Sequence, residues 1–173
     1  HFWHWLKTEY ANQNPSLKTP NEEKIKSLFK EYTLWEKKEN YTKQMFEKSK
    51  NIFCKFLSKD TLNNITREQL IEIYKNLHSG DERNSRFHSA EKFVNNNNLD
   101  TIKKGLQYLL YSNDDIVLRI DSLISLDSKL KLEEFGPSCT QELIGWVFYD
   151  KYPMRNDKAD FGVKFLGYKF DIT

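Results

Sequence analysis

The sequence predicts an all-α, multi-helix fold for three reasons. Apolar residues recur every third and fourth position along most of the chain, capping residues precede these runs, and no stretch shows the alternation of a strand. The pattern predicts about seven to nine helices. A chain of 173 residues is long enough to form one domain with its own core.

The first amphipathic helix is expected to begin after Asn21, because Asn is a favoured N-cap and two glutamates follow it. Thr33 and Glu36 have the spacing of a capping box, which predicts that a second, long helix begins there and continues to Leu57. Cys54 lies among the apolar positions of that helix and is interpreted as a small core residue.

A second capping box at 66–69 predicts a helix that ends before Gly80 and has one inward face, formed by Leu70, Ile73, Tyr74 and Leu77. A short helix is expected within 86–94, and the four asparagines at 95–98 are expected to interrupt it. Further helices are predicted after Asp100 and after Asn113 or Asp114. Residues 1–99 and 100–173 are expected to pack together as one domain.

Composition excludes several classes of protein. Two cysteines rule out a disulfide scaffold and favour a reducing, cytoplasmic location. No apolar run reaches the length of about 18 residues that a membrane span needs, and no signal peptide is visible. The chain begins without Met, so we expect it to be a fragment of a longer protein.

Motifs for catalysis and cofactor binding are missing from the sequence. It contains no P-loop, no nucleophile elbow and no glycine-rich dinucleotide loop. The four histidines and two cysteines do not have the spacing of a zinc site. We therefore expect no metal, no cofactor and no enzymatic activity in this chain.

The segment Phe135-Gly136-Pro137-Ser138 predicts a tight turn followed by a helix. Glycine permits a positive φ in the turn, and proline is favoured at the first helical position. Ser138 and Thr140 add hydroxyls at the helix start, where free N–H groups and the helix dipole can receive a phosphate. The alternative is an ordinary corner between two helices.

This segment resembles a helix-hairpin-helix, whose core reads L-P-G-[IV]-G-x-x-[TS]-A. Gly136 matches the second glycine, and Glu134 replaces the first. The resemblance implies contact with the DNA backbone. Glu133 and Glu134 lie in this turn, and their charges make the local electrostatic potential more negative than DNA binding favours.

A longer string resembles a helical domain that precedes the AAA+ GTPase motor of McrB-type, modification-dependent restriction proteins. It includes Phe135-Gly136-Pro137, Glu142-Leu143-Ile144, Tyr152-Pro153-Met154-Arg155-Asn156 and Phe165-Leu166-Gly167-Tyr168, and it covers about the last 65 residues. The resemblance implies a DNA-associated module with the motor and nuclease outside this chain. Its expected partners are duplex DNA, modified or plain, and that motor domain.

Helix-hairpin-helix DNA glycosylases are an alternative family. The resemblance would place their catalytic Lys and Asp at Ser138 and Asn156, neither of which supplies the needed chemistry. Asp157 lies one residue later and would serve if the alignment were shifted. A third alternative is a module that binds only protein, favoured by the acidic turn and the high apolar content.

Charge is uneven along the chain. Residues 1–60 carry 12 Lys and 8 Asp or Glu, and this segment includes Lys37, Lys38 and Lys43. These lysines are candidate phosphate contacts, with an ordinary solvated helix surface as the alternative. Arg155 is a further candidate for DNA contact, or it forms an ion pair with Asp150 or Asp157.

Overall fold

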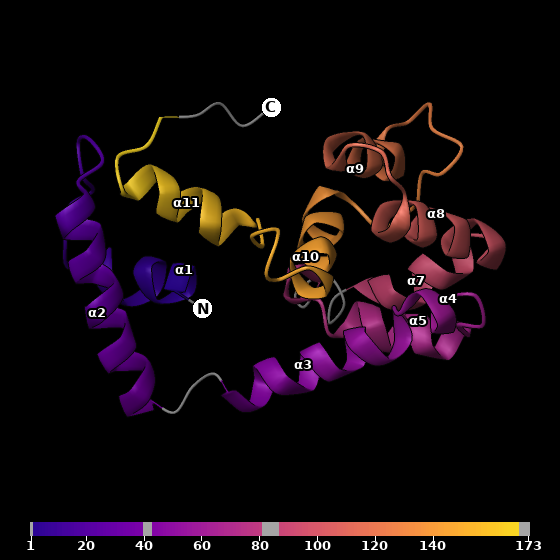
Figure 1. The fold of residues 1–173 in the computed structure, drawn as a ribbon, viewed down its shortest axis with the longest axis horizontal. Helices are drawn as coiled ribbons and strands as arrows, with labels where there is room; N and C mark the ends of the chain where they lie inside the picture. Colours follow the sequence, from indigo (N-terminus) through magenta and orange to yellow (C-terminus); the bar gives the residue numbers. More distant parts are fainter. Residues whose placement is uncertain (1, 40–42, 81–86, 170–173) are drawn as a thin grey trace. The chain divides into compact units, whose positions relative to one another are not determined.

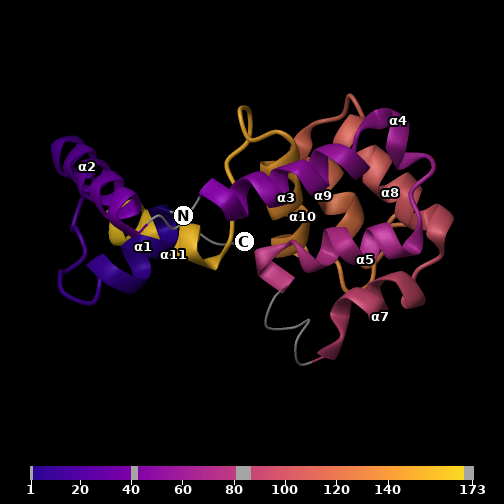
Figure 2. The same cartoon turned by 90° about the horizontal axis from the view of Figure 1, so that it is seen from below.

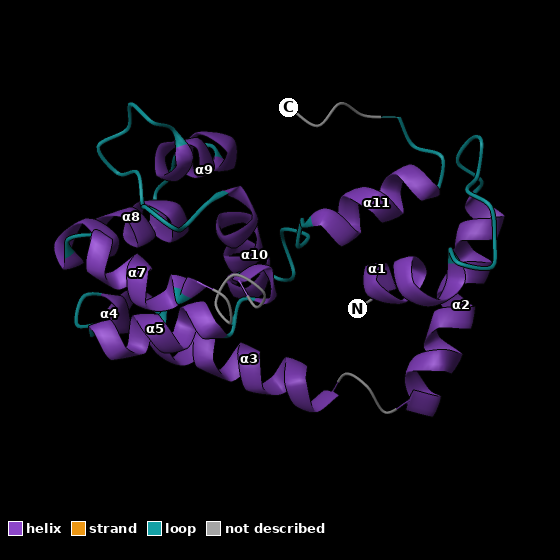
Figure 3. Ribbon diagram, turned by 180° about the vertical axis from the view of Figure 1, so that it is seen from behind, coloured by secondary structure: helices purple, strands orange, loops and turns teal. Residues whose placement is uncertain are grey.

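The computed structural model describes residues 2–39, 43–80 and 87–169 (Figure 1). Within these ranges the chain forms ten α-helices and two short helical turns, with no strand (Figure 3), so the all-α prediction is confirmed. The chain divides into a terminal unit of residues 1–46 and 155–173 and a central unit of residues 47–154. The boundary expected after residue 99 falls inside the central unit.

The terminal unit combines helices from the N-terminal and C-terminal parts of the sequence. It contains α1 (Phe2–Trp5), η1 (Leu6–Tyr10), α2 (Glu22–Glu39) and α11 (Asp157–Phe165). Its buried core is apolar and mostly aromatic, formed by Phe2, Trp5, Leu6, Leu28, Phe165 and Leu166. Trp3 lies against the backbone of Gly162 so closely that a Cβ there would overlap its ring. Aromatic packing therefore holds α11 against α1.

Helix α2 begins where the sequence predicts and ends later. Asn21 caps it, because its Oδ1 accepts a hydrogen bond from the Lys24 N–H at 2.9 Å. The prediction that a new helix begins at Thr33 is wrong, since α2 continues through this residue and the Thr33 hydroxyl donates to the Phe29 carbonyl at 2.8 Å. Ile25, Tyr32 and Trp35 pack on the core from one continuous face, and this packing overrides the local capping signal.

The central unit is a cluster of short helices (Figure 2). It contains α3 (Lys43–Phe56) from residue 47 onward, α4 (Lys59–Leu62), α5 (Arg67–Lys75), η2 (His78–Gly80), α7 (Ser89–Asn96), α8 (Leu99–Tyr111), α9 (Ile116–Ile124) and α10 (Pro137–Val147). The four residues predicted to face inward are buried, three of them on α5 and Leu77 two residues after its end, and Trp146 of α10 is buried as well. Cys54 is exposed, so its interpretation as a core residue is wrong.

Capping residues define several helix starts in this unit. The capping box of Thr66 and Gln69 is confirmed, with both reciprocal hydrogen bonds present. Helix α8 is capped by Asn98 and not by Asp100, and α9 is capped by Asp115 and not by the residues one or two positions earlier. These predictions were wrong by one or two residues because several neighbouring residues there are of capping type.

The tight helical hairpin expected near the C-terminus is not confirmed. Helix α9 ends at Ile124 and α10 begins at Pro137, so a loop of turns over 125–136 joins them (Figure 3). The residue with positive φ in this loop is Glu134, at 63°, whereas Gly136 has a φ of −76°. The glycine therefore does not supply the left-handed conformation that the sequence suggested.

Candidate functional site

The start of helix α10 is the feature that the sequence singled out. Pro137 occupies its first position as predicted, and the N-cap residue Gly136 makes no side-chain capping hydrogen bond, because glycine has no side chain. A Cβ added to Gly136 would have no heavy atom within 4 Å, so this backbone faces open space. Pro137 and Ser138 are both exposed. Because a helix start leaves N–H groups without intrahelical partners, this end of α10 is able to donate to an anion.

Thr140 is placed differently from Ser138. It is fully buried, and its hydroxyl donates to the Gly136 carbonyl at 3.0 Å. The Thr140 hydroxyl is therefore used in a hydrogen bond within the helix and does not face a ligand. The Ser138 side chain is exposed.

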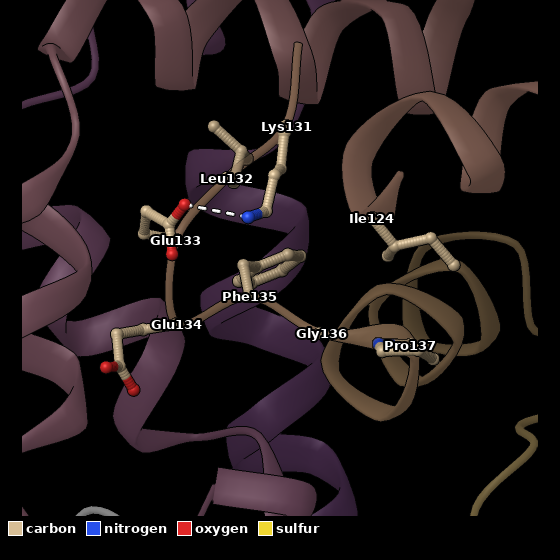
Figure 4. Close-up of a pocket in the computed structure, with 8 residues that line it drawn as sticks. All are labelled: Ile124, Lys131, Leu132, Glu133, Glu134, Phe135, Gly136 and Pro137. Carbon is tan, nitrogen blue, oxygen red and sulfur yellow. Dashed lines mark ion pairs between the residues drawn. The ribbon is translucent and has the colours of Figure 1, made fainter. Parts of the chain in front are cut away.

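A surface cavity of about 380 Å³ lies beside this helix start. Its walls come from one residue of α9, from the loop before α10 and from the first residue of α10, namely Ile124, Lys131, Leu132, Glu133, Glu134, Phe135, Gly136 and Pro137. Figure 4 shows Lys131 and Glu133 as an ion pair, 2.9 Å apart, with the Glu134 side chain directed away from that pair. The cavity thus combines one cation with two carboxylates, and the cation is already paired.

Asn97 and Tyr74 hold the loop that lines the cavity through hydrogen bonds to its backbone. Asn97 is buried; its side chain accepts from the Glu133 N–H at 2.9 Å and donates to the Glu133 carbonyl at 3.0 Å. The Tyr74 hydroxyl donates to the Glu134 carbonyl at 2.8 Å. One asparagine of the predicted helix-interrupting run therefore binds a loop 36 residues away in the sequence.

A buried polar network lies further along α10. The Glu142 carboxylate, 1% exposed, accepts from the backbone N–H groups of His78 and Ser79, each at 2.8 Å. The His78 Nδ1 lies 3.1 Å from the same carboxylate, and the Trp146 indole donates to it at 3.2 Å. This carboxylate joins η2 to α10 with the hydrogen bonds that a buried charge requires.

The environment of Glu142 acts on its pKa in two opposite ways. Burial raises the pKa of the carboxyl, whereas the hydrogen bonds from His78 and Ser79 lower it. The hydrogen bonds prevail, and the pKa lies below its ordinary value. Glu142 is therefore a carboxylate at neutral pH.

Sequence reasoning gave Glu142 no role of its own. A signal for its burial is present in the pattern, because it lies on α10 three residues after Cys139 and four before Trp146, which are both buried. An acidic residue on the apolar face of a helix indicates a buried partner. The partner at residues 78–79 is more than 60 positions away and has no sequence signal.

The predicted basic residues belong to the other unit. Arg155 is exposed, and its Nε donates to Asp160 Oδ1 at 2.9 Å, so it forms an ion pair as the alternative interpretation held, though with a different aspartate. Lys37 and Lys38 are exposed in the last turn of α2. The side chain of Lys43 lies outside the described residues.

Net charge differs between the units. By sequence, the terminal unit has 12 Lys or Arg and 9 Asp or Glu, and the central unit has 15 and 16. The excess of positive charge therefore belongs to the terminal unit, which carries Lys37, Lys38 and Arg155, and the helix start at Pro137 belongs to the nearly neutral unit.

The described part of the chain has neither a membrane-spanning helix nor a cluster of metal ligands. None of its helices has both the length and the apolar character needed to cross a membrane. No three of its His, Cys, Asp or Glu residues are grouped as metal ligands would be.

Comparison with known proteins adds no relative. No protein-family model matches the chain, and neither the curated proteins nor the solved structures include one that is significantly similar to it.

Proposed function

We propose that this chain is a non-catalytic, DNA-associated accessory domain of a restriction or related AAA+ system. The observation that supports this proposal most is the start of α10, where Pro137 and the exposed Ser138 follow an uncapped, open glycine. Such a helix start suits a backbone phosphate, because N–H groups and the positive end of the helix dipole point outward. A helix-hairpin-helix-like use of this turn remains part of the proposal.

The partners in this proposal are duplex DNA, plain or cytosine-modified, and an AAA+ motor domain in the cytoplasm. Lys37, Lys38 and Lys43 of the basic terminal unit would add contacts to phosphates. These contacts carry no sequence information, so discrimination between duplexes would come from other side chains.

Fluorescence anisotropy of labelled duplexes tests the proposal. We expect binding to both duplexes to weaken steeply between about 50 and 200 mM salt, since phosphate contacts release counterions. The double variant Lys37→Glu/Lys38→Glu is expected to weaken binding and to reduce the salt dependence. Absence of binding at low salt by folded protein would contradict the proposal, and release of a base from the duplex would contradict its non-catalytic part.

The variant Ser138→Asp tests the start of α10 directly. An aspartate there favours the helix through its dipole but repels a phosphate, so binding is expected to fall by about tenfold while stability is kept. Asn64→Asp is the matched control, because it adds the same charge at an exposed position of the same unit after α4. Equal effects of the two variants would rule out a specific phosphate contact at Ser138.

A further inference from the structure

Helix α9 has an apolar surface that the fold leaves uncovered. Val117 is 66% exposed, Leu118 59% and Leu126, just after the helix, 82%. We call these three residues the α9 face. Helix α9 packs mainly on α8 and α10 and lies at the outer side of the central unit (Figure 1). Val117 and Leu118 are consecutive on α9, and Leu126 follows two positions after the helix ends; large apolar side chains exposed close together along the chain in this way indicate an interaction surface.

The opposite side of α9 packs against the rest of the central unit through Leu123 and Arg119, so the α9 face is not needed to anchor the helix. Leu123 is fully buried there, and Arg119 is 7% exposed. The Arg119 guanidinium turns inward and donates from Nη1 to the Leu109 carbonyl at 3.0 Å, close to the C-terminal end of α8. Burial of this arginine also removes the cation of α9 from the surface.

The exposed charged side chains between residues 112 and 127 are all acidic. They are Asp114, Asp115, Asp121 and Asp127. Three of these carboxylates accept hydrogen bonds from the Tyr108 hydroxyl, the Val117 N–H and the Ser125 hydroxyl. The exposed cations Lys104 and Lys129 flank this segment in the sequence and lie outside it. The exposed apolar residues of the α9 face therefore lie among four carboxylates along the chain, and the exposed cation that follows them is Lys129.

We propose that the α9 face docks a basic amphipathic helix of a partner protein. The exposed valine and leucines would bury the apolar stripe of that helix, and the four aspartates would face its lysines and arginines. The same carboxylates disfavour nucleic acid and anionic lipid, whose charge has the same sign. The surface thus selects a protein segment of positive charge.

This inference stands apart from the proposed DNA contact. It depends on α9, whereas the phosphate contact depends on the start of α10 and on Lys37, Lys38 and Lys43. Loss of one activity by mutation is expected to leave the other in place, which makes their failures distinguishable.

The test uses the full chain and a labelled synthetic peptide of about 18 residues, long enough to form an isolated helix. Its leucines recur every third and fourth position, and its other residues are lysine and alanine. Two control peptides are used: one has the same composition in scrambled order, and the other has glutamate in place of lysine. We expect saturable binding of the first peptide only, weakened by salt.

Variants of the α9 face locate the binding. Val117→Lys/Leu118→Lys is expected to weaken binding of the peptide by about tenfold or more, because it removes apolar contact and adds like charge. Asp121→Asn/Asp127→Asn is expected to weaken it less and to reduce its salt dependence. Leu34→Lys is the control, since it makes the same kind of change at a residue 69% exposed on α2.

Two results would overturn the proposal. One is equal binding of the scrambled peptide, which would show that charge alone attracts it. The other is unchanged binding by the Val117→Lys/Leu118→Lys variant when far-UV circular dichroism shows it to be folded. Lost binding by the Leu34→Lys control would also count against the α9 face as the site.

Discussion

Glu142 and His78 are joined twice: the Glu142 Oε1 atom accepts from the His78 backbone N–H at 2.8 Å and lies 3.1 Å from the ring Nδ1. The carboxylate is almost completely buried, and burial by itself raises its pKa. The hydrogen bonds from His78 and Ser79 lower the pKa by more, so it lies below its ordinary value. The carboxylate fixes η2 on α10, the helix whose start is the proposed DNA contact. The first two predictions concern this pair.

Replacing Glu142 by glutamine is expected to destabilise the protein by about 2 kcal/mol, because one amide N–H₂ group then faces a backbone donor in a buried site. Urea unfolding followed by circular dichroism measures this free energy. Glu133→Gln is the control, since the Glu133 side chain is 57% exposed and forms a surface ion pair with Lys131. Equal midpoints for the two variants would show that the Glu142 network adds nothing to stability.

Acidification is expected to remove the contribution of Glu142. Because its pKa is lower in the folded state, this contribution is fully present above the unfolded value, near 4.5, and is lost as the pH falls through the folded value. Unfolding free energies measured between about pH 7 and pH 3 should therefore fall more steeply for the natural chain than for Glu142→Gln. Parallel curves would contradict this assignment.

Gly145 lies in the middle of α10 against Met154. A Cβ there would be 2.7 Å from the Met154 Cα and 2.9 Å from its N atom, so Gly145→Ala forces the backbone apart. We expect a loss of about 2 kcal/mol in spite of the better helix propensity of alanine. Gly136→Ala at the start of the same helix meets open space and should change stability by less than about 0.5 kcal/mol. Thermal unfolding compares the two.

Glu134 holds a left-handed conformation, with a φ of 63°, that costs a side-chain-bearing residue free energy. Glu134→Gly is expected to stabilise the protein by about 0.5–1 kcal/mol, measured by urea unfolding, because glycine adopts this φ without strain. Its carbonyl remains available to the Tyr74 hydroxyl. Glu133→Gly is the matched control and should not stabilise. A loss of stability in Glu134→Gly would mean that the strain is absent.

The two cysteines should differ in reactivity. Cys54 is exposed and Cys139 is buried, so a thiol reagent such as Ellman's is expected to modify one thiol rapidly in the folded chain and both after unfolding. Cys54→Ser should abolish the rapid phase. Rapid modification of both thiols in the folded protein would mean that the start of α10 opens readily.

Many of the helices were predictable from the sequence, with several of their starts, but α1, α4 and α11 were not. The signals at Asn21, Thr66 and Pro137 act within one turn of the chain, so they define a helix start wherever that helix finally packs. The same kind of signal failed at Thr33, where packing of one long face on the core outweighs a single cap. The prediction that Cys54 is a core residue was wrong, because apolar neighbours in the sequence do not show which side of a helix packs against the core.

The candidate site was predictable only in part. Local sequence located the exposed start of α10, because glycine, proline and serine define that turn by themselves. Tertiary structure decided that Asn97 and Tyr74 fix the loop before it, that Glu142 receives the 78–79 backbone, and that α11 joins α1 in the terminal unit. Those contacts join residues dozens of positions apart, and such pairings depend on the packing of the whole chain rather than on the residues around each partner.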